Sequence, residues 1–174
     1  MPSQSPTGLI GVSIVALARL LAASTAFRTL VGAASADEAL PFIYYLEASD
    51  AVVSGVTPPR LIEPRPRAII ANTGKLTTSR IGSGGWREEG DLLLSLELPI
   101  PAAYLGDWRE EALWAGNTVG AIWKDVQDNS GGSDGTNPYL NVTMIDWDQE
   151  LAPCEPSQGT EYFWGCTLRC SYVG

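Results

Sequence analysis

The spacing of apolar residues predicts an amphipathic helix between Gly106 and Val126. Apolar residues recur there at intervals of three and four, which places them on one helix face. That face comprises Trp108, Ala112, Ala115, Val119, Ile122 and Val126. The opposite face comprises Arg109, Glu110, Asn117 and Lys124. Asp107 is expected to cap the helix, and Glu110, three positions later, to complete a capping box.

The N-terminal segment Leu9–Ala36 is predicted to be a second amphipathic helix. Two adjoining stripes at helical spacing form an apolar arc that is wider than on most surface helices. Such an arc predicts contact with a neighbouring subunit in addition to the helix's own sheet. The candidate subunit-interface residues are Ile10, Ile14, Leu17, Leu20, Leu21 and Phe27.

The same segment resembles a secretion signal, because Ala34-Ser35-Ala36 could form a cleavage site. However, the residues before the apolar run contain no Lys or Arg, and Arg19 interrupts the run. The charges also disfavour a membrane span, which needs about 20 apolar residues with few charges. We therefore expect a helix of the folded protein and no membrane contact.

Further along, five segments of branched, aromatic or alternating residues predict strands. Leu92, Leu94, Leu96 and Leu98 alternate with Leu93, Ser95 and Glu97, and Pro99 is expected to end that strand. Arg67–Ile81 is expected to form two short strands with a turn at Asn72–Gly74. Loops are expected at Ser49–Pro66, Gly82–Gly90, Gln127–Pro138 and Asp148–Thr160. The remaining strands are Leu40–Ala48, expected to be buried, Tyr139–Trp147 and Glu161–Val173.

These elements predict an α+β fold over residues 1–174 as one domain. The expected architecture is a mostly antiparallel twisted sheet with the N-terminal helix and the second amphipathic helix packed on it.

Composition removes several classes of chemistry. The chain has no histidine, which excludes Ser-His-Asp and Cys-His catalysis and histidine-based metal sites. Its net charge of −9 disfavours tight binding of nucleic acid, since phosphate contacts need clustered Lys and Arg. The short basic cluster Arg60, Arg65 and Arg67 lies in a Pro-rich stretch and is interpreted as a solvated linker.

Two groups of acidic residues are candidates for a catalytic or metal-binding site. Asp146, Asp148 and Glu150 could act as paired carboxylates or hold a divalent ion, but are expected to be simply exposed where a strand enters a loop. Asp128–Gly135 lacks calcium-loop spacing, because the twelfth position is Tyr139. We predict no catalytic residue, no cofactor, no metal and no enzymatic activity.

The order of predicted elements resembles the tail terminator proteins of long-tailed bacteriophages. Three stretches carry the resemblance: "LIGVSIVALARLLAASTAFRTLV", "LLLSLELPIPAAYLGDWREEALWAGNTVGAIW" and "YLNVTMIDWDQELAPCEPSQGTEYFWGCTLRCSYV". The segment Ser49–Gly90 departs from that order, with a Pro-rich passage and an extra hairpin. Another neck or tail-completion protein of similar fold would resemble the sequence in the same way.

The resemblance implies a structural virion protein, assembled in the host cytoplasm, that forms a hexameric ring. The ring would cap the tail tube protein and dock to a neck or head-completion protein, and to a sheath protein in a contractile tail. DNA would pass through without specific binding, which suits an acidic wall. The expected neck-contact residues lie in the Gln127–Pro138 loop: Asp128, Asn129, Ser130 and Asp134.

A different class also fits the sequence. A secreted acidic carbohydrate-binding or hydrolytic domain would use exposed tryptophans and the carboxylates near Asp146, with Leu9–Ala36 as its signal.

Overall fold

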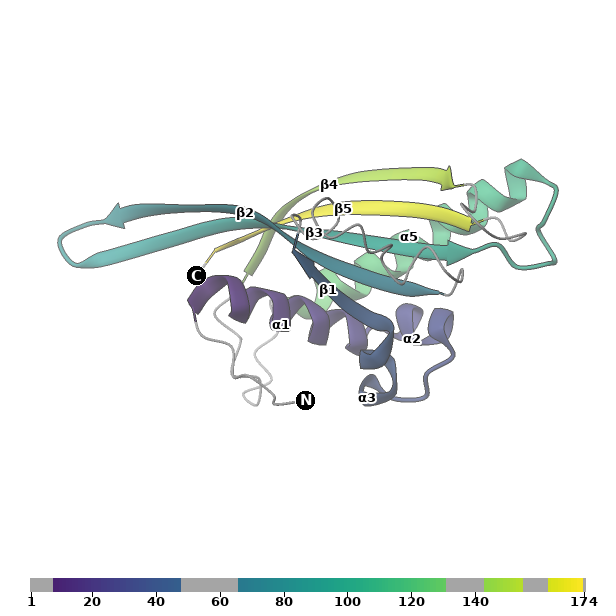
Figure 1. Ribbon diagram of the computed structural model, residues 1–174, viewed down its shortest axis with the longest axis horizontal. Coiled ribbons are helices and arrows are strands. Elements are labelled where there is room, and N and C mark those ends of the chain that lie inside the picture. Colours follow the sequence, from purple (N-terminus) through teal and green to yellow (C-terminus); the bar gives the residue numbers. More distant parts are fainter. Residues whose placement is uncertain (1–7, 48–65, 131–142, 155–162, 174) are drawn as a thin grey trace.

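The computed structural model describes residues 8–47, 66–130, 143–154 and 163–173. They form an α+β fold with one five-stranded sheet in the order β1-β2-β3-β5-β4 (Figure 1). Only β1 (Ile43–Glu47) and β2 (Arg67–Ile81) pair in parallel. β3 (Gly85–Pro99), β5 (Phe163–Val173) and β4 (Thr143–Cys154) complete the sheet through antiparallel pairs. The predicted fold class, a mostly antiparallel sheet with helices packed on it, is confirmed.

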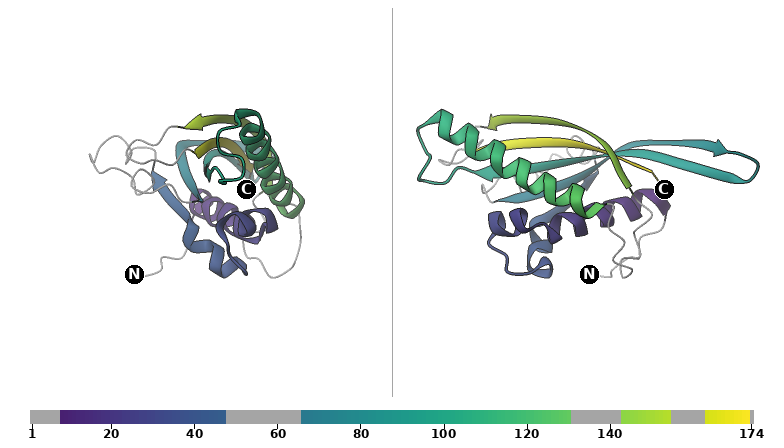
Figure 2. Two further views of the ribbon diagram at one scale, coloured as in Figure 1. Left: turned by 90° about the vertical axis from the view of Figure 1, so that its right-hand side faces the viewer. Right: turned by 180° about the vertical axis from the view of Figure 1, so that it is seen from behind.

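The helices cover one face of this sheet (Figure 2). α1 (Gly8–Ala23) lies against β2 and β3, and α5 (Trp108–Ser130) lies beside it. Three short elements follow α1, namely α2 (Thr25–Val31), α3 (Ala36–Ala39) and the 3-10 helix η1 (Leu40–Phe42). This helical layer leaves the β2–β3 hairpin end of the longest axis uncovered, whereas the start of α5 reaches the opposite end, as Figure 1 shows.

The hydrophobic core lies between the helices and β3. Leu92, Leu94, Leu96 and Leu98 are all at most 1% exposed, so their predicted period-two alternation is confirmed. β3 ends at Pro99, also as predicted. The helices contribute fully buried side chains to the same core, among them Leu17, Leu21, Phe27, Ala115, Val119, Ile122 and Val126.

The predicted single N-terminal helix is wrong, because the helix breaks at Ser24 and the two parts are bent by 76°. The Ser24 hydroxyl accepts a hydrogen bond from the Phe27 N–H at 3.1 Å, as an N-cap does. It also donates to Oδ2 of Asp125 at 2.9 Å, and the Ala26 N–H donates to the same oxygen at 3.1 Å. Side chains from two helices therefore satisfy N–H groups that the start of α2 would otherwise leave unpaired.

The predicted turn at Asn72–Gly74 is also wrong. β2 is one strand of 15 residues, and the Asn72–Leu76 region holds only a register irregularity in its pairing with β3. The chain turns instead at residues 82–84, where Gly82 has a φ of 62°. The expected Gly82–Gly90 loop is therefore mostly strand, and β2 and β3 form a long hairpin.

The other boundaries differ in smaller ways. Leu40–Phe42 is a 3-10 helix, and β1 is an edge strand in which Tyr44 and Tyr45 are 39% and 51% exposed. Among the β1 side chains whose burial is described, the expected burial holds for Ile43 alone. β4 continues to Cys154. Asp146, Asp148 and Glu150 therefore lie within a paired strand, not at its exit into a loop.

In the described ranges, no helix is by itself long and apolar enough to cross a membrane. Only Gly11–Ala23 and Thr25–Val31 taken together reach that length and composition, and they are sharply bent.

Candidate functional site

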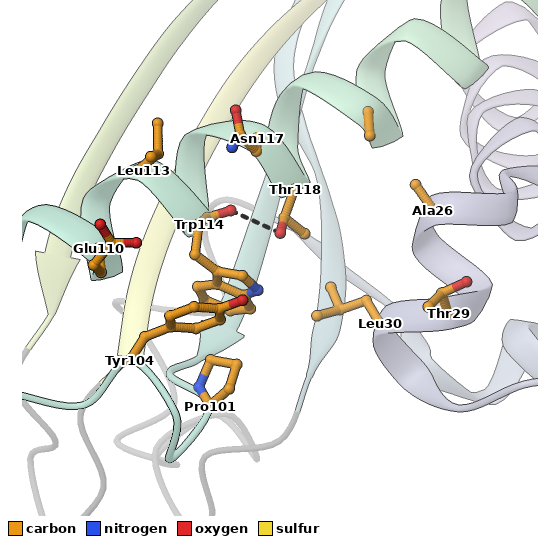
Figure 3. Close-up of a pocket in the computed structure, with 11 residues that line it drawn as sticks. Ala26, Thr29, Leu30, Pro101, Tyr104, Glu110, Leu113, Trp114, Asn117 and Thr118 are labelled. Carbon is orange, nitrogen blue, oxygen red and sulfur yellow. Dashed lines mark hydrogen bonds between the residues drawn. The ribbon is translucent and has the colours of Figure 1, made fainter.

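The best-formed pocket in the described part of the chain is an open groove of about 590 Å³ between α2 and the first half of α5. The segment that joins β3 to α5 closes one side with Pro101 and Tyr104 (Figure 3). Tyr104 stacks on Trp114, with ring centroids 6.4 Å apart and planes 26° apart. Leu30 of α2 also lines the groove. We call this pocket the α2–α5 groove.

The lining of the groove suits the binding of apolar side chains better than it suits catalysis. Among its lining residues, Glu110 is the one ionisable carboxylate, and no nucleophile stands beside a base. The Thr118 hydroxyl donates to the carbonyl oxygen of Trp114 at 2.8 Å and so serves the helix backbone. Such a lining provides shape and apolar contact, with a few polar groups at its rim.

Large apolar side chains gather beside the groove at the start of α5. Four of the eight large exposed hydrophobic residues in the described part lie within ten positions of one another, which makes this end of the molecule unusual. They are Tyr104 at 36% exposure, Leu105 at 58%, Trp108 at 73% and Leu113 at 57%. We call these four residues the α5-end patch.

The start of α5 is well capped, which fixes the patch in place. Oδ1 of Asp107 accepts hydrogen bonds from the N–H groups of Arg109 and Glu110, at 3.0 and 3.3 Å, so the predicted cap is confirmed. The return bond comes from Glu111, which accepts from the Gly106 N–H at 2.7 Å, and not from Glu110 as predicted. Glu110 is therefore left at the rim of the groove.

The apolar face predicted for this helix is confirmed at Ala115, Val119, Ile122 and Val126. It is wrong at Trp108, which is the first residue of α5 and lies mostly in solvent. The predicted polar face is confirmed, since its four members are exposed: Arg109, Glu110, Asn117 and Lys124.

The opposite end of the molecule is formed by the tip of the β2–β3 hairpin (Figure 1). β1 pairs with β2 only as far as Asn72, and β5 pairs with β3 only between Pro99 and Glu89. Beyond those residues the hairpin is a two-stranded ribbon, and Ile81 near its tip is 55% exposed. Arg80 donates to the Ser83 carbonyl at 3.5 Å, and Arg87 pairs with Glu89 at 2.7 Å. We call residues 77–87 the arm tip.

The candidate interface residues on the N-terminal helices are mostly occupied inside the chain. Leu17, Leu21 and Phe27 are 0% exposed, which leaves them no surface for a neighbouring subunit. Ile14 and Leu20 are half-buried against the same core, and the side chain of Ile10 lies outside the described residues. The wide apolar arc has an internal cause, because α1 contacts α2, α3, α5 and two strands.

The candidate neck-contact residues are also placed differently. Asp128, Asn129 and Ser130 belong to the last turn of α5, not to a loop, and Asp134 lies outside the described residues. Asp128 pairs with Lys124 four positions earlier, and the Asn129 side chain donates to the Asp125 carbonyl at 2.7 Å. These contacts extend the helix past the point where apolar spacing ends.

Arg67 was interpreted as part of a solvated linker, and this is wrong. Its side chain is 4% exposed and forms an ion pair with Glu97, its direct cross-strand partner. Its guanidinium also lies 6.0 Å from the centre of the Tyr44 ring. Arg60 and Arg65 lie outside the described residues.

The pKa of the exposed Lys124 is raised by its hydrogen bond to Asp128 and by the charge of that carboxylate. Two further groups in the described part have a pKa that departs from its ordinary value. The pKa of Asp125 is held below its ordinary value by the hydrogen bond from the Ala26 N–H and by that from Ser24, although burial opposes this. The pKa of Tyr45 is raised by burial, against the field of Arg19. Both are structural contacts. Within the described residues, no group of three or more Cys, Asp or Glu side chains could hold a metal, and the side chains of Asp146, Asp148 and Glu150 are outside that description.

No protein-family model matches the sequence, and no curated protein matches it.

Proposed function

We propose that this chain is a structural protein that assembles head to tail into a closed ring. The supporting observation is that one molecule has two exposed surfaces at its opposite ends, the α5-end patch and the arm tip. When two different surfaces of one chain meet between copies, the contact is heterologous, and it gives a ring if the rotation closes.

The exposed apolar surface favours assembly with other chains over a monomeric state. Soluble monomers rarely expose contiguous apolar patches larger than a few hundred Å², and larger ones mark interaction sites. Tryptophan and tyrosine are also the residues that most often anchor protein interfaces. Trp108 and Tyr104 supply both types within the α5-end patch.

The role of the ring comes from the resemblance to tail terminator proteins. The ring would cap the phage tail tube and dock it to the neck, leaving a channel for DNA. A net charge of −9 supports this role, because an acidic wall repels phosphate and lets DNA slide. Another neck or tail-completion protein of similar fold would use the same two surfaces.

The secreted carbohydrate-active alternative fits the structure less well. α1 and α2 lie within the supposed signal and supply Leu17, Leu21 and Phe27 to the core. Removing that segment would open the core that the rest of the fold needs.

The ring is tested by measuring the mass of the purified protein by light scattering and by imaging it on tail tubes by electron microscopy. We expect a closed ring of several copies, with six as the resemblance implies, at one end of each tube. A protein that stays monomeric in solution and binds tubes as a single copy, or not at all, would contradict the proposal.

A further inference from the structure

We infer that the α2–α5 groove receives the arm tip of a second copy of this chain. This rests on the proposed function, because it names the contact through which one copy meets the next. This contact would cover the arm tip of one copy and the α2–α5 groove of the next, so that neither surface stays exposed in the ring.

The first argument is position. The arm tip and the α2–α5 groove lie at opposite ends of the long axis (Figures 1 and 2). A chain cannot bring its own rigid, paired hairpin back across its own sheet. The contact must therefore be between copies, and it repeats in one direction around a ring.

The second argument is apolar complementarity. Ile81 is 55% exposed near the tip, while the groove offers Leu30, Leu113 and Trp114. A volume of about 590 Å³ lies in the range of pockets that enclose drug-sized ligands, so it can admit side chains from a hairpin tip. A two-stranded hairpin is only marginally stable alone in water, and docking would cover it.

The third argument is charge. The arm tip has two arginines, Arg80 and Arg87, in a chain whose net charge is −9, and Glu88 and Glu89 follow it directly as the cross-strand partners of Thr78 and Thr77. Residues 106–111, at the mouth of the groove, have three acidic residues and one arginine. Glu110 lines the groove itself. Arg87 already pairs with Glu89, so Arg80 is the arginine that we place opposite Glu110. Opposite charges on the two surfaces steer association and fix its register.

Site-specific cross-linking tests the contact directly. Full-length Ile81→Cys and Leu113→Cys proteins are mixed, alone and on tail tubes, and treated with a short bismaleimide. We expect a covalent dimer containing one chain of each variant, with a peptide joining positions 81 and 113 identified by mass spectrometry. The parent protein gives the background from its three native cysteines. The matched control replaces Leu113→Cys by Lys124→Cys, which is exposed on the same helix away from the groove.

Charge reversal gives a second, independent readout. Arg80→Glu should weaken self-association at least tenfold, and adding Glu110→Arg should restore most of it. Lys124→Glu, the matched control, should change association little. Folding of each variant is checked by circular dichroism, so that a loss of association is not mistaken for unfolding.

The outcomes separate this inference from the proposed function. Rings without the 81–113 cross-link, or without rescue by Glu110→Arg, overturn the arm-to-groove contact and leave the ring standing. A protein that neither forms rings nor cross-links in solution or on tubes overturns both. A link between position 81 and a tube or neck protein means that the arm serves a different partner, and this also overturns the inference.

Discussion

Both halves of β3 form backbone hydrogen bonds with β2, but the two halves have different surroundings. From Asp91 to Pro99, every second residue is a leucine that is at most 1% exposed beneath the helices. From Gly85 to Glu88, the strand still pairs with β2 but no longer with β5, and the hairpin extends beyond the helices (Figure 1). The strand continues because β2 continues beside it, and not because a core demands it. Stability should therefore reside in the inner half, and association in the outer half.

The two ends of β2 also differ, and at each end the burial of one residue is the opposite of what is usual for its type. At the inner end, Arg67 is 4% exposed, although arginine is rarely buried. At the outer end, Ile81 is 55% exposed, although isoleucine is usually buried. The buried charge is accounted for inside the chain by Glu97. The exposed isoleucine has no such account within one copy, which is why we assign it to a neighbour.

The largest effect is expected from breaking the buried ion pair at the inner end. Glu97→Ala removes the carboxylate that forms an ion pair with the buried Arg67, and should lower the free energy of unfolding by about 3–5 kcal/mol. Urea denaturation followed by circular dichroism measures this. The double variant Arg67→Met/Glu97→Leu removes both charges and should stay within about 1–2 kcal/mol of the parent. Equal losses in the single and double variants would contradict the argument.

The next effect concerns the leucine row. Leu94→Ala removes a fully buried side chain and leaves a cavity, so we expect a loss of about 2–5 kcal/mol in urea denaturation. Its matched control is Thr78→Ala, on the exposed part of the hairpin, which should change stability by no more than about 0.5 kcal/mol. If the two variants lose similar stability, the hairpin is part of the cooperative core after all.

The sequence predicted the inner half of this contrast well. The Leu92–Leu98 alternation, the stop at Pro99 and the buried face of α5 follow from periodicity, because burial on one side leaves that signature. The outer half gives no such signal, since Gly85 and Arg87 are exposed, Glu88 and Glu89 are partly buried, and no row of apolar residues continues there. The turn was misplaced because "NTG" and the Gly-rich "GSGG" are both turn-like, and only the strand pairing shows that the chain turns at the second.

Three of the interface residues predicted on the N-terminal helices, Leu17, Leu21 and Phe27, are buried inside the chain. The interface was placed on α1 because its apolar arc is wide, but the width reflects several internal neighbours. The break at Ser24 has a local part, the N-cap hydrogen bond from the Phe27 N–H, and a distant part, the bond to Asp125 about 100 positions later, which no local pattern reveals. The exposed residues of "AYLGDW" were the available signal, because Tyr104, Leu105 and Trp108 are crowded into a short loop and helix start.

A smaller effect is expected where Asp125 joins α5 to the start of α2. Asp125→Ala removes the acceptor for the Ser24 hydroxyl and the Ala26 N–H, and should cost about 1–2 kcal/mol near neutral pH. The folded-state pKa of Asp125 is lowered from 3.8, so its contribution is complete above that pH. It is lost as the pH falls through the lowered value. The difference between parent and variant should therefore narrow below pH 3.8 in urea titrations. Asp128→Ala, one turn later, should show little effect at any pH. A difference that stays constant, or widens, in acid would mean that the carboxylate does not make these bonds.

The smallest effect on stability should come from Trp108, and it is best measured against another tryptophan of the same helix. Trp108 is 73% exposed, whereas Trp123 is 6% exposed. Trp123→Ala should lose about 3–5 kcal/mol, as large core truncations do. Trp108→Ala should change the unfolding free energy of the single chain by no more than about 0.5 kcal/mol, because the ring is mostly exposed and contacts the Arg109 guanidinium, which lies 5.8 Å from the ring centre. Its effect should appear in sedimentation velocity instead, as weaker self-association, since exposed tryptophans often anchor interfaces. If Trp108→Ala destabilises the monomer as much as Trp123→Ala does, then Trp108 is a core residue and the α5-end patch is not a free surface.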